Sequence, residues 1–335
     1  MVGAVPQCCG QAGSKASDSA FVACSEGSRA PVRYVQEGER AMKGTARKRR
    51  DLTALFFLLP YLLFFVVFIL IPLCHGLILS FQEWSLLSDP VWVGLQNYIE
   101  LLDLRRFKAA VQNTFMFALE SVPLLLIVPL LVALLLNKKF FGNRFAQNAT
   151  ISPFLIPSSS VLLLWIWMLD SQTGMINHGL RALGLQPQSW LSHQGSAMGV
   201  IVFVTLWWTA GFNIILYLSS LQDLPPELYE AAAVDGANGW NQFWHITLPL
   251  LRSRMLFICT LQIIGSFKLF DQVYILTGGG PAGGTRTLAF YLYETGFRDF
   301  MFGRAAAVSW YMFILIGFFG LLQAKFLSRW LGEGV

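Results

Sequence analysis

Two charged residues of opposite sign stand inside an apolar stretch of this sequence, where they could act on a passing solute. Lys268 and Asp271 are three residues apart within residues 255–276, close enough to pair on one face of a helix. A lysine at the centre of a membrane-spanning helix costs roughly 2.5–3.5 kcal/mol to insert, so it persists more readily beside a polar cavity or a partner charge. Two hypotheses follow: the pair lines a solute pathway, or it serves the structure alone.

A helical projection of the same stretch separates its polar from its apolar side chains. If residues 255–276 form one helix, a narrow face that suits lipid or an apolar neighbour carries Ile263, Phe267, Phe270 and Tyr274. A broad opposite arc suits a polar interior. The candidate pathway residues on that arc are Gln262, Ser266, Lys268, Asp271 and Gln272, with Gly265 among them.

A second apolar stretch, residues 197–221, adds one polar candidate and two aromatic ones. Asn213 offers an amide to the same pathway, and Trp207 and Trp208 precede it. Aromatic faces commonly stack on sugar rings, but tryptophan is also a common anchor at the membrane interface, and the anchor is the favoured interpretation. Glu120, expected near the outer face, could line an entrance or pair with a neighbouring subunit.

Other chemistry is disfavoured by residue type and spacing. The run from Gly278 to Thr285 resembles a phosphate-binding loop, but Gly284 stands where that loop needs its lysine. The run also follows an apolar stretch instead of a strand, so we expect a flexible outer loop that binds no ATP. The histidines and cysteines show no metal-ligand spacing. The residues therefore predict that this chain has no ATP site and binds no metal or cofactor.

Composition identifies the class of protein that must position these residues. Hydrophobic residues make up 55% of the 335 and charged residues only 13%, against about 25% charged in soluble domains. Stretches close to the ~20 apolar residues that span a bilayer predict an all-α, polytopic membrane protein. Prolines inside several stretches are compatible with membrane helices, whose neighbours satisfy the freed backbone groups. The six expected spans are residues 54–80, 113–136, 151–169, 197–221, 255–276 and 305–327.

Basic residues predict the orientation of these spans. The cluster from Arg47 to Arg50 directly precedes the first span, which is typical of a cytoplasmic flank and favours a membrane boundary over nucleic-acid binding. Six spans then return the C-terminus to the cytoplasm. Residues 1–50 are too polar to bury a core and predict a disordered cytoplasmic tail, so residues 51–335 form the transmembrane domain.

The segment between the fourth and fifth spans, residues 222–253, predicts two short helices joined by a bend. Pro225 or Pro226 suits a first helical turn, and Glu227 is favourable near the positive end of that helix. Gly236 permits the bend because glycine tolerates a positive φ. Asn238 could cap the second helix through its side chain.

The same segment resembles the EAA motif of binding-protein-dependent ABC importer permeases. The motif reads Glu-Ala-Ala, three residues, Gly, nine residues and Ile-x-Leu-Pro, and every fixed position is present at that spacing. In that family the two helices dock in a groove of an ATPase subunit. The resemblance implies that the coupling residues here are Glu230, Ala231, Ala232, Asp235, Gly236, Ile246, Leu248 and Pro249.

The resemblance extends over most of residues 50–330. It includes Val93–Tyr98, Asn113–Thr114 and the run from Trp165 to Asn177. The run from Phe270 to Thr285 is similar to the branch that imports sugars and glycerol phosphates. Within that branch the exact sugar stays open, and glycerol phosphate or an oligosaccharide are both compatible with the residues.

The resemblance also implies the partners and the location of the chain. It implies a type I importer in a bacterial or archaeal plasma membrane, with a second homologous permease, two ATPase subunits that carry ATP and Mg²⁺, and an external solute-binding protein. Two alternatives remain: an ion-gradient-driven secondary transporter and a membrane scaffold without transport. The first would not need the EAA motif, and the second would not need Lys268 and Asp271 inside a span.

Overall fold

The computed structural model describes residues 56–138 and 140–331. The chain divides into two units, residues 1–72 and 73–335, and each is described by itself. The predicted tail, residues 1–50, lies outside the described residues. Within the described ranges the protein is a helical membrane protein, as the sequence predicts, with one short β-hairpin added.

The first predicted span is a single helix whose described part begins in the first unit. It covers Phe56–Ser80 with a mean hydropathy of 2.8, and it includes the π-helical turn η1 (Val66–Leu70) and α2 (Ile71–Ser80). Its 25 residues are long enough to cross the hydrocarbon core of a bilayer. No charged residue interrupts them.

The second unit begins with a small cap at the end of α2. The antiparallel strands β1 (Gln82–Glu83) and β2 (Val91–Trp92) lead into α3 (Gln96–Asp103). Asn97 is buried and its Nδ2 donates to the carbonyl oxygens of Ser80, at 3.0 Å, and Gln82, at 2.8 Å. These bonds hold α3 against the start of the hairpin.

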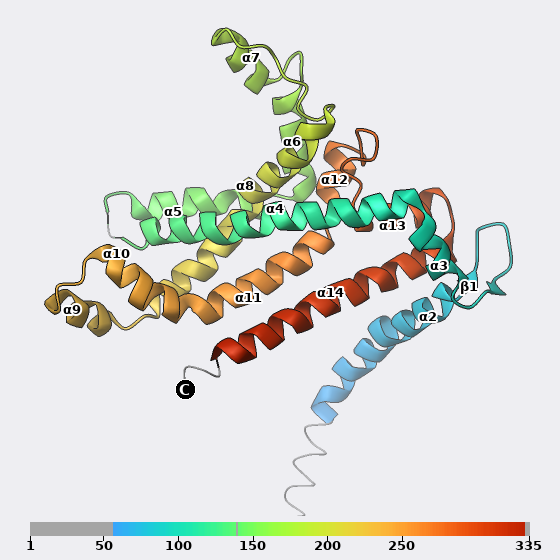
Figure 1. Ribbon diagram of the computed structural model, residues 1–335, viewed down its shortest axis with the longest axis horizontal. Helices are drawn as coiled ribbons and strands as arrows, with labels where there is room; N and C mark the ends of the chain where they lie inside the picture. Colours follow the sequence, from blue (N-terminus) through green and yellow to red (C-terminus); the bar gives the residue numbers. More distant parts are fainter. Residues whose placement is uncertain (1–55, 139, 332–335) are drawn as a thin grey trace, which may run out of the picture. The chain divides into compact units, whose positions relative to one another are not determined.

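Three long helices pack together in the second unit: α4 (Arg105–Leu136), α8 (Gln194–Gln222) and α11 (Leu248–Phe267). In Figure 1 the helix α14 (Phe302–Leu331) runs beside α11. The short helices α9 (Pro226–Val234) and α10 (Gly239–Gln242) lie at one end of this group. The helices α12 (Asp271–Leu276) and α13 (Leu288–Tyr293), with the π-helical turn η4 (Glu294–Arg298), lie toward the other end.

The predicted span 151–169 is bent, so it is not one straight helix. It consists of α5 (Asn143–Ile151), the 3₁₀ turn η2 (Ser152–Leu155) and α6 (Ser158–Leu169), with a bend of 98° between the two halves. Pro157 explains the break, because the residue before a proline is driven out of the helical region, and Ile156 has an extended ψ of 136°. Among the described residues there are therefore five helices of spanning length, or six spans if the bent pair is one.

The predicted span 255–276 also has different limits. A continuous helix, made of α10, the π-helical turn η3 (Phe243–Thr247) and α11, covers Gly239–Phe267. It ends before Lys268, and α12 begins separately at Asp271, where a carboxylate is favourable in a first helical turn. The single ideal helix assumed for the polar arc is therefore wrong beyond Phe267.

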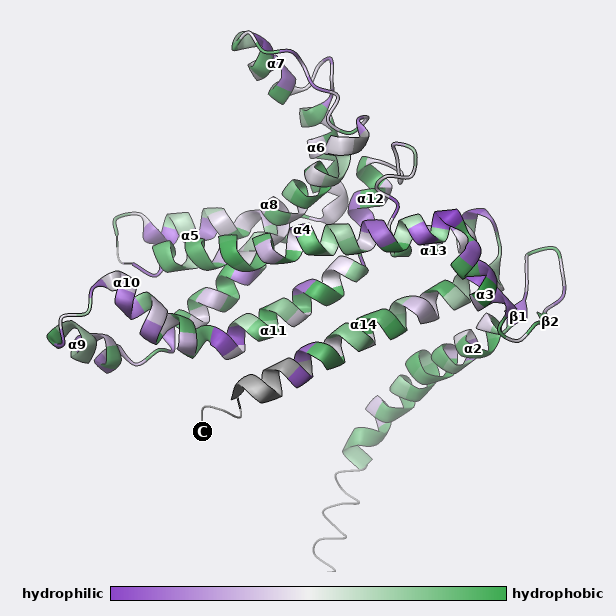
Figure 2. Cartoon of the chain, viewed as in Figure 1, coloured by the Kyte–Doolittle hydropathy of each residue, from purple (hydrophilic) through white to green (hydrophobic). Residues whose placement is uncertain are grey.

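Three buried clusters hold the second unit together. One joins α6, α8 and α12 around Leu162, Ile201 and Val273. A second joins α4, α8 and α11, and a third joins α3, α4, α13 and α14. Elsewhere the helices expose apolar side chains, and Figure 2 colours the hydrophobic residues along α4, α11 and α14 green. Exposed apolar surface on this scale is expected where helices face lipid.

Between α6 and α8 the chain forms a polar connection that carries α7 (Met175–Ala182). Asn177 is fully buried there and donates from Nδ2 to the carbonyl oxygens of Asp170 and Gln188, while its Oδ1 accepts from Trp190 Nε1. The hydrogen bonds from Thr173 and Gln172 lower the pKa of the exposed Asp170 carboxyl. This connection closes the α6–α8 corner without contributing to the sites described next.

Candidate functional site

The segment 222–253 has the predicted short helix and bend, but its second arm is not a separate short helix, because α10 continues through η3 and α11 as one helix from Gly239 to Phe267. Pro226 is the first residue of α9 and Glu227 lies in its first turn. Gly236 has a φ of +82°, and the amide of Ala237 donates to the carbonyl of Ala232 at 2.8 Å. That pattern is a Schellman motif, in which glycine takes the left-handed position after a helix end. Asn238 then caps α10, because its Oδ1 accepts from the amide of Asn241 at 2.9 Å.

Side-chain bonds that the sequence analysis did not foresee tie the two arms of this loop together. The Tyr229 hydroxyl on α9 is 2.9 Å from the Thr247 hydroxyl on η3. Gln242 Nε2 donates to the carbonyl of Ala237 at 3.3 Å. The bend angle is therefore held by side chains as well as by Gly236, and nothing in the local sequence pattern marks these pairs.

The predicted coupling residues lie on and beside this loop. Most of them are exposed: Glu230, Ala231, Asp235, Gly236 and Pro249. Ala232, Ile246 and Leu248 are half-buried. The exposed apolar side chains of Leu228 and Val234 adjoin them on α9. The loop thus presents a mixed surface of two carboxylates, small side chains and apolar residues at one end of the long helices, where a partner could bind.

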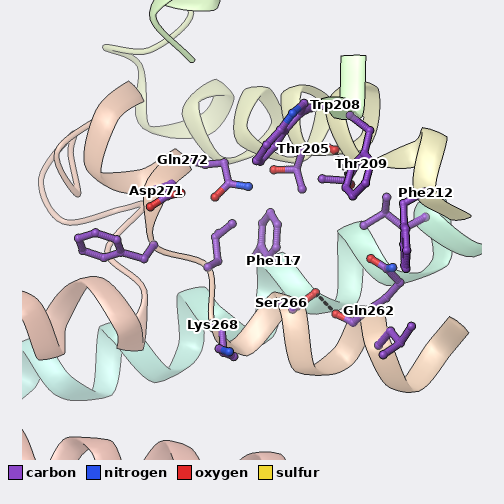
Figure 3. Close-up of a pocket in the computed structure, with 16 residues that line it drawn as sticks. Phe117, Thr205, Trp208, Thr209, Phe212, Gln262, Ser266, Lys268, Asp271 and Gln272 are labelled. Atoms are coloured by element: carbon purple, nitrogen blue, oxygen red, sulfur yellow. Dashed lines mark hydrogen bonds between the residues drawn. The ribbon is translucent and has the colours of Figure 1, made fainter. Parts of the chain in front are cut away.

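A cavity of about 470 Å³ lies along the middle of the long helices. Its walls come from α4, η2, α8, α11 and the segment that follows α11. Figure 3 shows these side chains around the opening. The residues that line it are Phe117, Leu125, Phe154, Thr205, Trp208, Thr209, Phe212, Leu261, Gln262, Gly265, Ser266, Lys268, Leu269, Phe270, Asp271 and Gln272.

Five of the six predicted pathway residues line this cavity: Gln262, Ser266, Lys268, Asp271 and Gln272. The sixth, Asn213, is fully buried behind the wall. Its Oδ1 accepts from Gln262 Nε2 at 2.8 Å, and its Nδ2 donates to the carbonyl of Leu125 at 2.9 Å. Asn213 therefore orients Gln262 toward the cavity region and does not line the cavity itself.

The bond from Asn213 to Leu125 has a cause in the α4 sequence. Pro129 lies inside α4 and has no backbone N–H, so the carbonyl four residues earlier loses its helical partner. That carbonyl belongs to Leu125. Asn213 from α8 replaces the missing donor, which is the kind of compensation that allows proline inside membrane helices.

The proposed Lys268–Asp271 pair does not form. Within the described part of the chain no ion pair joins the two residues, and Asp271 Oδ2 instead accepts from the Ser158 hydroxyl at 2.9 Å. Lys268 directly follows the last residue of α11 and Asp271 begins α12, so the helical i,i+3 geometry is absent. Lys268 is exposed and sits at a helix end rather than mid-span. Figure 3 shows the two side chains at separate parts of the cavity.

The aromatic candidates take different roles. Trp208 lines the cavity, and its Nε1 donates to the carbonyl of Ile156 at the bend at 3.2 Å. Trp207 packs edge-on against Trp165. Both tryptophans lie near the middle of α8, so the favoured interpretation as interfacial anchors does not fit their positions. Glu120 is exposed near the middle of α4, not near its outer end, and does not line the cavity.

Thr205 is a cavity residue that the sequence analysis missed. It is 7% exposed, and its Oγ1 has no hydrogen-bond partner within the described residues. A buried hydroxyl without a partner costs free energy unless something binds it. Threonine is common in membrane helices, so its type alone carries no signal; only the helix packing singles it out.

The glycine-rich run does not have the geometry of a phosphate-binding loop. The glycine-rich run lies between α12 and α13 and is closed by hydrogen bonds: Thr285 Oγ1 donates to the carbonyl of Gly280 at 2.6 Å, and Asn113 Nδ2 donates to that of Gly283 at 2.9 Å. The strand-to-helix turn of a phosphate-binding loop is absent there. No cluster of three or more metal-binding side chains occurs among residues 56–138 and 140–331.

Comparison with known proteins finds one family along most of the chain. The family described as binding-protein-dependent transport system inner membrane component matches residues 102–333. The arabinooligosaccharides transport system permease protein AraP of Bacillus subtilis is 36% identical over 284 residues, which cover 83% of this chain and 89% of that protein. The trehalose/maltose transport system permease protein MalF of Thermococcus litoralis is 34% identical over 272 residues, covering 80% and 91%.

A solved structure shares the fold. A chain of the bacterial alginate ABC transporter, crystallised with its alginate pentasaccharide-bound periplasmic protein, superposes with a TM-score of 0.76 over 84% of this chain and 95% of that one. The two sequences are 23% identical, so this likeness concerns the arrangement of helices.

Proposed function

The chain belongs to the binding-protein-dependent transport system inner membrane component family, and from that premise we propose that its cavity admits a neutral sugar. Membership makes it the multi-pass membrane permease of an ATP-driven ABC importer, and a separate subunit hydrolyses the ATP. It works with a partner permease, an ATPase and a solute-binding protein. The substrate, the number of copies of each partner subunit and the orientation of the chain in the membrane are inferred.

The observation that carries the sugar proposal is the chemistry of the cavity wall. Trp208 and Phe212 offer aromatic faces, while Gln262, Gln272 and the unpaired hydroxyl of Thr205 offer uncharged hydrogen-bonding groups. Pockets that combine apolar walls with a few placed polar groups bind small polar ligands. A sugar ring has apolar C–H faces that can stack on the aromatic side chains. Its hydroxyl groups can form hydrogen bonds with the polar side chains.

The balance of charge in the cavity favours a neutral sugar over glycerol phosphate. Its lining has one cation, Lys268, and one anion, Asp271. A phosphate is usually held by several cationic or amide donors, and the nearby carboxylate would oppose it. AraP and MalF are named for arabinooligosaccharides and for trehalose and maltose, while UgpA of Yersinia pestis, 31% identical, is named for sn-glycerol 3-phosphate, so the charge of the cavity carries the choice.

The test is ATP-dependent uptake by the complete importer in proteoliposomes. Arabinotriose, maltose and sn-glycerol 3-phosphate serve as probes, each with the solute-binding protein present. We expect uptake of a sugar, and no effect of an ionophore that collapses ion gradients. Uptake that stops with the ionophore but needs no ATP would support the secondary transporter, and no uptake with any solute would support the scaffold.

We propose that the exposed surface of the loop 222–253 docks on the ATPase. It carries Glu230, Asp235 and Gly236 at the end of the long helices, away from α13. If two permeases each use one such loop, two ATPase subunits complete the importer. This arrangement places the loop and both termini in the cytoplasm. Cysteine labelling of an Asp235→Cys variant in sealed cells tests it, because only a membrane-permeant reagent should react.

The second permease is proposed to contact the face of α4 that carries Glu120. That carboxylate is exposed on the isolated chain near the middle of a spanning helix, where contact with lipid is costly. A neighbouring subunit or the pathway between subunits would remove this cost. We expect Glu120→Gln to weaken recovery of the partner permease on affinity purification, with Glu227→Gln, in the loop, as the control.

We also propose that this chain binds no nucleotide. The purified permease without its ATPase should not hydrolyse ATP, because Gly284 occupies the position where a phosphate-binding loop needs lysine. Turnover by the isolated chain that disappears in a Gly284→Ala variant would contradict this.

A further inference from the structure

Two cationic and three aromatic side chains are exposed where α4 ends and α5 begins. This group, here called the basic–aromatic turn, consists of Lys138, Phe140, Phe141, Arg144 and Phe145. The side chain of Phe141 is completely exposed, that of Phe145 is 79% exposed and that of Phe140 is 48% exposed. None of the three rings belongs to the buried clusters of the second unit. The isolated chain therefore leaves a substantial apolar surface uncovered at this point.

Side-chain hydrogen bonds fix the backbone of this turn. Asn143 Nδ2 donates to the carbonyl oxygens of Leu136, at 2.9 Å, and Lys138, at 2.7 Å. Gln147 Nε2 also donates to the Leu136 carbonyl, at 3.3 Å, which is one of those that a helix end leaves without a helical partner. Gly142 has a φ of +84°, which glycine adopts without strain. The exposed rings are therefore carried by an ordered turn.

The turn must lie close to a membrane surface, because it joins two segments that cross the membrane. It directly follows Leu136, the last residue of α4, and α5 begins the bent pair that forms the next candidate span. Figure 1 shows α5 beside α4, at the end of the long helices where α9 and α10 also lie. In the proposed orientation that end is cytoplasmic, where anionic lipids give the membrane surface a negative potential.

The charge of the turn is complementary to such a surface. No acidic residue occurs in the sequence between residues 137 and 151, and among the described residues no ion pair involves Lys138 or Arg144. Phenylalanine beside lysine and arginine is typical of segments that lie at the boundary between lipid headgroups and acyl chains. There the rings enter the apolar layer, while the long cationic side chains reach the phosphates.

We propose that the basic–aromatic turn is a binding site for anionic phospholipid of the adjacent leaflet. The rings of Phe141 and Phe145 insert among the acyl chains near the headgroups, and the cations of the turn hold the lipid phosphate. Bound lipid covers the apolar surface and anchors the connection between the second and third spans. The stability of the importer therefore depends on anionic lipid, whichever solute it carries.

The experiment measures the melting temperature of the complete importer in nanodiscs of phosphatidylcholine with increasing fractions of phosphatidylglycerol. We expect the melting temperature to rise with phosphatidylglycerol and then to level off. Lys138→Gln and Arg144→Gln should each raise the fraction that gives half of this rise about fivefold, the factor that one cation contributes near an anionic membrane surface. Phe141→Ser should make the rise smaller, whereas Phe141→Leu should keep it, because contact with acyl chains needs an apolar side chain.

Lys108→Gln is the matched control, because Lys108 is also exposed but lies near the opposite end of α4, and it should keep the wild-type response. An unchanged response in Lys138→Gln, Arg144→Gln and Phe141→Ser would overturn the lipid site. If inorganic phosphate reproduces the rise in pure phosphatidylcholine, the turn binds a free anion and not a lipid. Loss of the ATPase from the purified variants, with an unchanged lipid response, would show that the turn contacts that subunit instead. Sugar uptake tests the proposed function separately from all these outcomes.

Discussion

The loop 222–253 and the cavity differ in how their residues are brought together. The loop is one contiguous segment, and its conformation follows from residues such as Pro226, Gly236 and Asn238 that act on their immediate neighbours. The cavity gathers residues from Phe117 to Gln272 out of several helices, and its shape depends on where those helices break. Local chemistry therefore determines the conformation of the loop, and tertiary packing determines the cavity.

The largest effect is expected where the local geometry is strictest. Gly236 has a φ of +82°. For a residue with a Cβ, adopting this left-handed backbone conformation costs about 1–2 kcal/mol of free energy. Gly236→Val should misdirect α10 and reduce transport by more than about tenfold, with membrane insertion unchanged. Uptake assays on membranes with matched protein levels measure this.

Gly239→Ala is the control for that substitution, because Gly239 begins α10, has no positive φ and has open space around its Cβ position. It should transport at nearly the wild-type rate. If Gly236→Val does so as well, the loop does not couple the permease to its ATPase.

The second prediction concerns the cavity, whose walls depend on contacts between helices. Asn213→Leu removes the donor to the Leu125 carbonyl, which Pro129 has left without a helical partner, and it also frees the Gln262 amide. Leaving buried polar groups unsatisfied costs about 1–3 kcal/mol each. We expect a lower melting temperature in detergent and slower transport.

Two comparisons show whether this cost comes from the carbonyl. Thr260→Val removes a hydroxyl that bonds only within its own helix, so it should be nearly neutral. Combining Asn213→Leu with Pro129→Ala restores the backbone donor of α4 and should recover part of the lost stability. No recovery in the double variant would mean that Leu125 is not the group that Asn213 satisfies.

A third prediction concerns the two charges at the cavity. Because Lys268 and Asp271 form no ion pair, the effects of Lys268→Met and Asp271→Asn on transport should add within about 0.3–0.5 kcal/mol in a double-mutant cycle. Altered sugar preference in the variants would support their place in the pathway. A large coupling energy, with full recovery in the double variant, would restore the structural ion pair.

Elements that depend on short-range signals could be predicted from the amino-acid sequence. The first span, the glycine bend and the Asn238 cap follow from apolar content, positive φ and side-chain capping. The polar arc was assigned to one helix over residues 255–276, but the helix ends at Phe267. Because apolar residues continue past that end, the hydrophobic pattern gives no sign of the break. Even so, its polar members do line the cavity, since intramembrane polar groups are costly anywhere else.

The contacts between helices could not be predicted from one sequence. Pro129 reveals that some carbonyl needs a donor, but not that Asn213, far along the chain, supplies it. Thr205 and Trp208 look like ordinary residues of a spanning helix until α8 packs beside α11. The bend at Ile156 was signalled by Pro157, yet prolines elsewhere in the spans are tolerated without a comparable break.

The smallest effect is expected for the side-chain tie inside the loop, and it refines the idea that the loop is purely local. The Tyr229 hydroxyl lies 2.9 Å from that of Thr247, joining α9 to η3. A hydrogen bond of this kind contributes about 0.5–1.5 kcal/mol. Tyr229→Phe keeps the ring and removes only the hydroxyl, so it should lower coupling efficiency by a small factor, seen as more ATP hydrolysed per sugar imported. Thr247→Val removes this bond and also the one from Thr247 Oγ1 to the Gln242 carbonyl at 3.4 Å, so its effect should be at least as large, and the double variant should be no worse than Thr247→Val alone. Additive losses would mean that the two hydroxyls act through different partners, and that the bend at Gly236 alone sets the angle between the helices.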